Sequence, residues 1–350
     1  MSHALLNTGE WWSSWHVPNH PIQGMAFVMA TTGYRLPDVI MDIALDVDGR
    51  GEYTYIARRI SKQKEFSAVD IPVTSDGWYA FDSSDPRMIG YDYCTPDYIM
   101  GSLLIDPTLP RVESRVGSDL EEGYPALTCQ NRYHAIVFSS NMNARVVPQC
   151  EGLGNRKTYG EQQAVQHKNV LLVQRHAKSK TTGDMRVIWG GKGMRSRIVE
   201  RSGWQIIREG NAWLGVKGFS RTKSNASCGS SWDNDVILRM NDGKAPVALI
   251  AGRSEEHADI EAFASYLGTF SGEAKDGWFE LSGGKDKKLT LSLHLLSEGI
   301  PRVNGITINL APKKLFDCPF IESKHGSGIV NIRKGQRTLT INLSSTGSEL

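Results

Sequence analysis

From Tyr53 onward the chain consists of short apolar segments that end at turn-forming residues. The clearest segments are rich in β-branched or aromatic residues and are bounded by residues such as Gly, Asn, Asp and Ser: 135–138, 170–173, 204–207, 212–216, 236–238 and 247–250. Residues of these types fit a pleated, half-buried surface, and turns about every 8–12 residues are typical of antiparallel sandwiches and barrels. We therefore predict a mainly β fold of stacked antiparallel sheets, a β-sandwich.

Two hairpins are predicted near the C-terminus. Asn304-Gly305 lies between two short apolar segments, and this dipeptide favours a two-residue β-hairpin turn. The segments 329–332 and 339–343 flank Gly335 in the same way. Both patterns support pairing between strands that are neighbours in the sequence.

Three helices are predicted, two before the strand pattern begins and one within it. Helical spacing of apolar residues and flanking Pro or Gly predict helices over 21–31 and 37–46, joined by a short link into an αα-hairpin. Ile260, Phe263 and Leu267 share one helical face, which predicts a third helix over 255–267 that packs on the sheets. The predicted organisation is a helical region, 1–52, followed by an antiparallel β-sandwich domain, 53–350.

The distribution of charge is uneven along the chain. Residues 1–140 carry 10 Lys and Arg against 18 Asp and Glu, residues 141–223 carry 16 against 5, and residues 224–350 carry 14 against 15. A basic middle segment favours an anionic polymer as ligand. Because no helix-turn-helix, zinc-finger or RNP-like pattern is present, we expect an acidic polysaccharide and no nucleic acid. The alternative is that these cations are the solvated faces of strands.

The sequence lacks the motifs of several other classes. There is no apolar run of ~18 residues, so no membrane span is expected. The five cysteines include no C-x-x-C pair, and no Walker, G-x-S-x-G or H-E-x-x-H motif occurs, so we expect no metal and no cofactor. The N-terminus has no basic leader with an apolar region, so no signal peptide is predicted.

Polar residues gather at the starts of two predicted strands and in the loop between them. They are Tyr133, His134, Arg145, Asn155, Arg156, Tyr159 and His167. Removing a proton next to a uronate carboxylate requires a base and a group that neutralises the carboxylate. We therefore predict Tyr133, His134 and His167 as catalytic residues and the other four as substrate-binding residues. His134, Asn155, His167 and Arg145 should then converge on one concave surface. The alternative is that both histidines are ordinary strand-edge residues.

Nine tryptophans raise the question of a sugar-binding platform. Trp11 and Trp12 lie in a polar, turn-rich stretch and are the candidates for stacking on sugar rings. Trp204 and Trp213 lie inside predicted strands and are expected in the core.

Several stretches together resemble a known family. They are 91–102 (Tyr-Asp-Tyr-Cys-Thr-Pro-Asp-Tyr-Ile-Met-Gly-Ser), 154–155, 166–171, 203–204 with 210–216, 301–305 and 327–330. This set, from about Tyr34 to Leu343, is similar to heparinase II/III-like polysaccharide lyases. The resemblance implies an N-terminal (α/α) toroid, β-sandwich layers behind it and a substrate cleft between them. It also implies cleavage of a uronate-containing polysaccharide by β-elimination, with His134, Asn155 and His167 in the most similar stretches.

The chain departs from that plan because one αα-hairpin stands where the family has a whole toroid. In such lyases the toroid supplies an Asn, a His and a Tyr of the active site. We therefore expect little activity from the isolated chain unless a helical partner domain, or a homo-oligomer, completes the cleft. The alternative function is a non-catalytic carbohydrate-binding or structural sandwich that completes another chain's cleft. The expected location is cytoplasmic as the sequence stands, and secreted or periplasmic if it belongs to a larger lyase.

Overall fold

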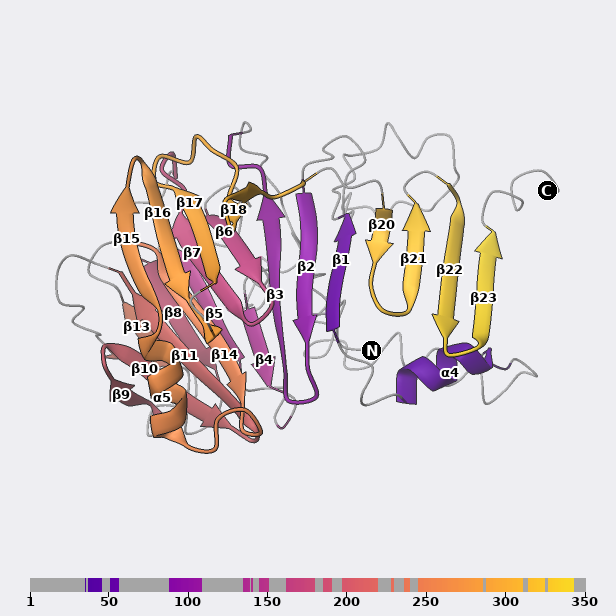
Figure 1. Ribbon diagram of the computed structural model, residues 1–350, viewed down its shortest axis with the longest axis horizontal. Coiled ribbons are helices and arrows are strands. Elements are labelled where there is room, and N and C mark those ends of the chain that lie inside the picture. Colours follow the sequence, from indigo (N-terminus) through magenta and orange to yellow (C-terminus); the bar gives the residue numbers. More distant parts are fainter. Residues whose placement is uncertain are drawn as a thin grey trace, which may run out of the picture.

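Three antiparallel sheets contain all the described strands (Figure 1). The structure is a computed structural model, and it describes residues 35, 37–45, 51–56, 88–108, 135–138, 140, 145–150, 162–179, 185–190, 197–219, 228–229, 236–239, 245–285, 288–310, 314–324 and 327–342. The prediction of a mainly β fold of stacked antiparallel sheets is confirmed.

The largest sheet has twelve strands. In spatial order they are β12 (Cys228–Gly229), β13 (Val236–Arg239), β8 (Met185–Gly190), β5 (Arg145–Cys150), β4 (Ala135–Phe138), β3 (Tyr98–Ile105), β2 (Met88–Cys94), β1 (Gly51–Ile56), β20 (Lys314–Asp317), β21 (Ile321–Lys324), β22 (Ile329–Lys334) and β23 (Arg337–Asn342). Strand β1 joins the N-terminal strands to the C-terminal ones, because it pairs with both β2 and β20.

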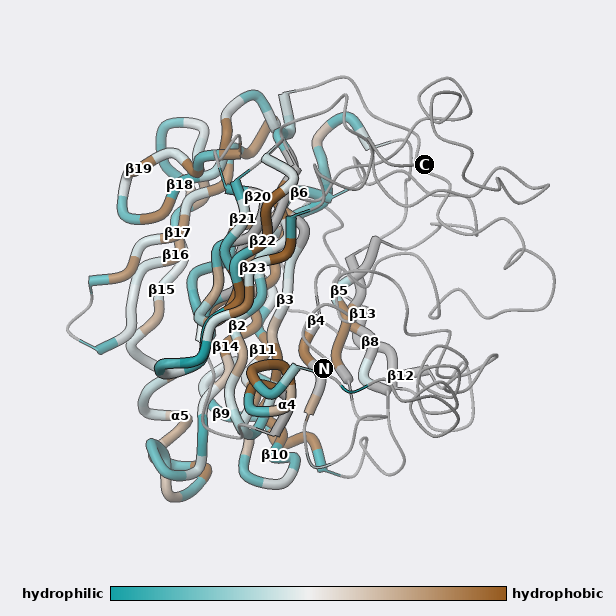
Figure 2. Tube along the Cα trace, turned by 90° about the vertical axis from the view of Figure 1, so that its right-hand side faces the viewer, coloured by the Kyte–Doolittle hydropathy of each residue, from teal (hydrophilic) through white to brown (hydrophobic). Residues whose placement is uncertain are grey.

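Two smaller sheets pack beside it. The six-stranded sheet has the order β6 (Gln162–His167), β7 (Val170–Arg175), β14 (Val247–Arg253), β11 (Ala212–Gly218), β10 (Trp204–Glu209) and β9 (Val199–Arg201). The five-stranded sheet has the order β15 (Ser271–Lys275), β16 (Trp278–Gly283), β17 (Leu289–His294), β18 (Arg302–Val303) and β19 (Ile306–Thr307). Figure 2 views the layers from the side, with β15–β17 at the left, β11 and β14 in the middle and β3–β5 to the right.

The six-stranded sheet is buried on both faces. Alternate residues of β7 and β14, such as Leu171 and Leu249, join Met100 in a core against the twelve-stranded sheet. The residues between them, such as Leu172 and Ile250, belong to a second core against the five-stranded sheet. A strand with two buried faces requires a continuous apolar run rather than an alternating one. The segments 170–173 and 247–250 are such continuous apolar runs. Trp204 and Trp213, which were predicted to lie in the core, are 1% and 5% exposed.

Buried glutamines connect this central sheet to the largest one. Gln162 and Gln166 on β6 share a face with the apolar residues of the first core. Their Nε2 atoms donate hydrogen bonds to the backbone carbonyls of Pro148 (3.4 Å) and Met100 (3.0 Å). These carbonyls belong to β5 and β3, so the amides span the gap between two sheets.

The other face of the β6–β7 hairpin makes the same kind of connection to the five-stranded sheet. Gln163 Nε2 donates to the carbonyl of His294 (2.8 Å), and Gln174 Nε2 donates to the carbonyl of Leu295 (3.1 Å). A buried amide costs free energy unless it is hydrogen-bonded. The four amides therefore favour one placement of the hairpin between the outer layers.

Two helices are described. α4 (Asp38–Leu45) packs on β22 and β23, where Arg337 forms a 2.8 Å ion pair with Asp42. It confirms the second helix of the predicted αα-hairpin, whereas the first, 21–31, lies outside the described residues. α5 (Ile260–Gly268) corresponds to the third predicted helix but begins five residues later than predicted. Its N-terminus is fixed by Asp259, whose side chain accepts a hydrogen bond from the backbone N–H of Ala262 (2.8 Å).

α5 rests on a glycine of the central sheet. A Cβ atom on Gly215 of β11 would lie 2.4 Å from Leu267 Cδ1 and 3.2 Å from its Cγ, and Leu267 is fully buried. Gly215 therefore allows the helix to approach the sheet closely. Gly268, the last residue of the same helix, has open space around its Cα.

We expect Gly215→Ala to lower the free energy of unfolding by about 1–3 kcal/mol, because it overpacks the contact between α5 and β11. Gly268→Ala is the matched control and should leave stability unchanged within about 1 kcal/mol. Urea unfolding followed by circular dichroism measures both. Equal stability of the two variants would show that α5 does not depend on this contact.

Candidate functional site

The sequence-predicted site falls mostly outside the described structure. Trp11, Trp12, Tyr133, His134, Asn155, Arg156 and Tyr159 all lie outside the described residues. The backbone of Arg145 begins β5 in the twelve-stranded sheet, whereas His167 ends β6 in the six-stranded sheet. The convergence of His134, Asn155, His167 and Arg145 stays a prediction, and His167 is the residue around which a site can be built.

His167 precedes an unusual turn. β6 and β7 are joined by Lys168 and Asn169 alone, and Lys168 has φ = 48°. This left-handed region is unfavourable for a side chain with a Cβ and is usually occupied by Gly. In three other two-residue hairpin turns of the described chain, a non-glycine residue at positive φ is followed by Gly: Ser202-Gly203, Asp276-Gly277 and Asn304-Gly305. The Lys168 turn has no such glycine.

Hydrogen bonds from three directions hold this turn. The Lys168 backbone N–H donates to Tyr91 Oη (3.0 Å), and Gln166 Nε2 donates to the Lys168 carbonyl (3.0 Å). Asn169 Nδ2 donates to the carbonyl of Ala251 (2.6 Å), and the Ala251 N–H donates back to the Asn169 carbonyl (2.9 Å). Strained backbone persists only where its surroundings fix it, and it is frequent at functional sites.

Charged groups surround the turn. Glu52 on β1 accepts a hydrogen bond from Tyr91 Oη (2.6 Å) and lies 3.9 Å from Lys168 Nζ. Both charged side chains are about half exposed, at 43% and 49%. We call Glu52, Tyr91, His167 and Lys168 the hairpin cluster.

Burial sets the protonation of the cluster. It lowers the pKa of His167, and Lys168 lowers it further, although Glu52 acts in the opposite direction. Burial and the hydrogen bond to Glu52 raise the pKa of Tyr91. At neutral pH the cluster therefore holds a neutral imidazole that can accept a proton and a phenol whose proton stays in the hydrogen bond to Glu52, beside the half-exposed side chain of Lys168.

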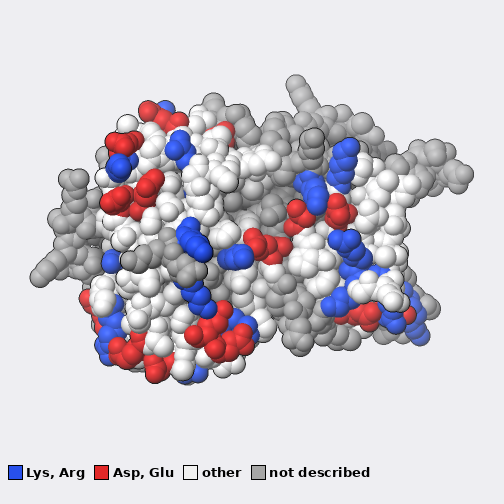
Figure 3. All heavy atoms as spheres, in the orientation of Figure 1, with Lys and Arg blue, Asp and Glu red and all other residues white. Residues whose placement is uncertain are grey.

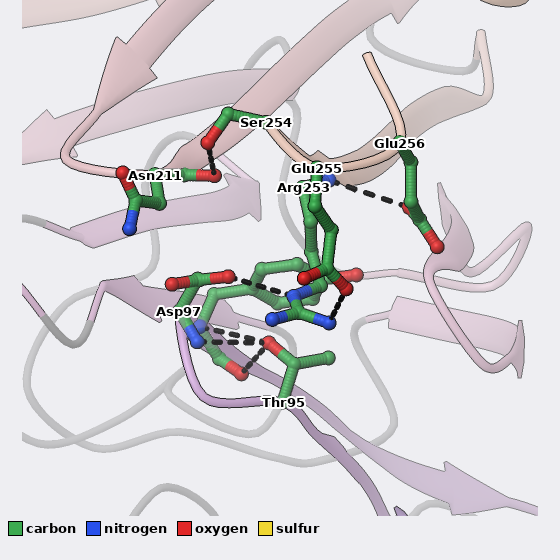
Figure 4. A network of polar contacts seen from close by, with 8 residues as sticks. Thr95, Asp97, Asn211, Arg253, Ser254, Glu255 and Glu256 are labelled. Atoms are coloured by element: carbon green, nitrogen blue, oxygen red, sulfur yellow. Dashed lines mark hydrogen bonds and ion pairs between the residues drawn. The ribbon is translucent and has the colours of Figure 1, made fainter. Parts of the chain in front are cut away.

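A second polar network closes the neighbouring edge of the layers (Figure 4). Arg253, at the end of β14, forms a 2.7 Å ion pair with Asp97 from the β2–β3 turn and a second pair with Glu255. Thr95 Oγ1 fixes the turn by donating to the Tyr98 carbonyl (2.9 Å) and accepting from the Tyr98 N–H (3.0 Å). Because carboxylates already occupy the Arg253 guanidinium, this network joins two sheets and is no ligand site.

His257 links α5 to the same edge. Its ring stacks on Tyr266 at 4.8 Å between centroids, and Tyr266 Oη accepts a 3.4 Å hydrogen bond from Asn169. Burial lowers the pKa of His257. The neutral imidazole therefore belongs to the packed state of the helix.

Sequence reasoning missed Glu52 and Tyr91 as members of the site. Tyr91 belongs to the stretch 91–102 that carries the family resemblance, and nothing in that stretch connects it with a turn 77 positions away. The motif 166–171 did include Lys168, yet its unusual backbone conformation has no sequence signal.

Comparisons with known proteins assign no family. No protein-family model, no curated protein and no solved structure matches this chain. Within the described ranges, no group of three or more His, Cys, Asp or Glu residues is placed to hold a metal ion. None of the helices among the described residues has the length and apolar character needed to cross a membrane.

The buried His257 predicts a dependence of stability on pH. Because its pKa is lowered in the folded state, the unfolded chain binds more protons below about pH 6.5, the ordinary value for His. Stability is therefore complete above that pH and declines as the pH falls through 6.5 toward the folded pKa. His257→Phe keeps an aromatic ring against Tyr266 and should reduce this decline, as measured by urea unfolding between about pH 5 and 8. An unchanged decline would contradict the assignment.

Proposed function

We propose that this chain binds a uronate-containing acidic polysaccharide at the hairpin cluster. The observation that supports it is the pairing of a neutral imidazole, His167, with the half-exposed ammonium group of the next residue, Lys168. An ammonium group recognises a carboxylate, and a nearby neutral imidazole is the kind of base that β-elimination requires. Lys168 stands on a turn held by hydrogen bonds, and His167 is the strand residue directly before it.

In a lyase reaction the members of the cluster have distinct tasks. Lys168 neutralises the uronate carboxylate, which makes the C5 proton more acidic. His167 accepts that proton, the C4–O4 bond breaks, and a double bond forms between C4 and C5. The protonated His167 then gives this proton to the departing O4, while Tyr91, whose hydroxyl donates to Glu52, supports the turn by accepting the Lys168 N–H.

On the face shown in Figure 3, single cationic side chains rather than a broad basic surface would recognise this ligand. Figure 3 shows that Lys and Arg are interspersed with Asp and Glu over the described part of this face. A long stretch of polyanion would meet both signs of charge there. Recognition of single carboxylates by placed cations is consistent with such a surface.

A second candidate function is a non-catalytic carbohydrate-binding or structural module that completes the cleft of another chain. One observation favours it: burial and Glu52 raise the pKa of Tyr91, so its phenol is a weak acid for protonating a leaving group. His167 would then have to serve as both base and acid. A helical partner domain, or a second copy of the chain, would supply the remaining groups.

Two substitutions separate binding from catalysis. Lys168→Gly fits the positive φ of the turn and removes the ammonium group, so we expect a folded variant with about tenfold weaker binding to polygalacturonate or alginate. His167→Gln should bind nearly as well as wild type but abolish any formation of unsaturated uronate, detected by its ultraviolet absorbance. Affinity electrophoresis measures the binding.

Lys178→Ala, which removes an exposed lysine from the turn after β7, is the control and should bind like wild type. Duplex DNA in a gel-shift assay should not be retarded. Wild-type binding by Lys168→Gly would contradict the proposed site, and tight binding to DNA without binding to the glycans would contradict the proposed ligand.

A further inference from the structure

The five-stranded sheet has one buried face and one open face. Burial alternates along β16, where Phe279 and Leu281 face the second core and Trp278, Glu280 and Ser282 face outward. No described helix or strand covers the outward face, which forms part of the surface in Figure 3. This face lies on a different sheet from the hairpin cluster.

An arginine is stacked on a tryptophan on this open face. The Arg302 guanidinium carbon lies 3.9 Å from the centre of the Trp278 ring. Trp278 is held in turn by His294, whose ring meets it edge-on at 5.0 Å, and by Gly299, where a Cβ would lie 2.8 Å from Trp278 Cη2. Both partners of the stack are partly buried.

The backbone that carries Arg302 is also fixed. β18 and β19 are joined by Asn304 and Gly305, both at the positive φ values of a tight hairpin turn. The Asn304 N–H donates to the Thr290 carbonyl (2.7 Å), and Asn304 Oδ1 accepts from the Thr290 N–H (2.8 Å). Little freedom therefore remains for Arg302 to lose when it binds a ligand.

The N–H groups of this guanidinium have no partner within the described part of the chain. Arg197, Arg201, Arg253 and Arg337 all form ion pairs with carboxylates. Arg302 stands in the same cross-strand row as Ser292 and Glu280, yet it makes no ion pair with Glu280 and lies over Trp278. A planar guanidinium whose donors are free matches the two oxygens of a carboxylate.

We propose that Arg302, stacked on Trp278, is a binding site for the carboxylate of a uronic acid unit. The neighbouring Glu280 disfavours doubly charged anions such as sulfate or phosphate more than a singly charged carboxylate. Ser282 and Thr290, whose hydroxyls lie 3.1 Å apart in the adjacent row, offer hydrogen bonds to sugar hydroxyls. The site does not depend on the hairpin cluster and would contact a second part of the same polymer, or a separate ligand.

The test uses trigalacturonate as ligand and isothermal titration calorimetry at low salt. Arg302→Lys keeps the positive charge but loses the planar guanidinium that stacks on Trp278, so we expect about tenfold weaker binding or more. Arg201→Lys, an exposed arginine paired with Glu261, is the matched control and should bind like wild type. Trp278→Phe should weaken binding to an intermediate degree, and thermal unfolding of each variant reports whether it folds.

The result that overturns the proposal is wild-type affinity in Arg302→Lys. Equal binding of the neutral trimer of galactose would overturn it too, as would stronger competition by sulfate than by acetate. Loss of trigalacturonate binding in Lys168→Gly but not in Arg302→Lys would overturn this site and leave the hairpin cluster standing. The reverse result would support this site and contradict the hairpin cluster.

Discussion

The architecture depends on how a sheet with two buried faces accommodates polar groups. Four glutamine amides of the β6–β7 hairpin lie in the interior and donate to backbone carbonyls of the sheets on either side. Each such hydrogen bond contributes about 1 kcal/mol, and losing one partner leaves a buried group unsatisfied at a cost of about 1–3 kcal/mol. Apolar packing alone has no direction, whereas these bonds specify where the hairpin sits relative to both outer layers.

The fixed hairpin explains how a strained turn can exist at its end. Lys168 keeps a positive φ because Tyr91, Gln166 and the Asn169–Ala251 pair hold the turn from three sides. Its half-exposed side chain follows directly after His167, whose pKa is lowered by burial. Arg302 on the five-stranded sheet is held in a similar way, because the Asn304-Gly305 turn fixes its backbone and the Trp278 ring fixes its side chain. In both places rigid surroundings orient a positively charged group toward solvent.

Much of the fold could be predicted from sequence because its signals are local. The β-branched segments gave strands at 135–138, 170–173 and 247–250, and Asn304-Gly305 gave a hairpin. The predicted helix 255–267 begins earlier than α5 does. The spacing of apolar residues shows which face of the helix is buried, whereas the first residue of the helix is set by the N-cap, Asp259. Contacts between layers have no local signal: Tyr91 meets Lys168, and Arg302 meets Trp278, because distant strands pack together. The prediction that His134 and Asn155 join His167 concerns residues outside the described ranges.

Amide hydrogen exchange at the Lys168 turn tests whether the β6–β7 hairpin is fixed and binds acidic sugars. We expect the Lys168 amide, which donates to Tyr91 Oη, to exchange about as slowly as amides of β7, and more slowly still with saturating trigalacturonate. The turn at Asp276-Gly277 in the five-stranded sheet serves as the internal reference for an ordinary hairpin. Tyr91→Phe should remove most of the protection. Exchange at Lys168 as fast as at Asp276, with no response to the ligand, would contradict a fixed hairpin that binds acidic sugars.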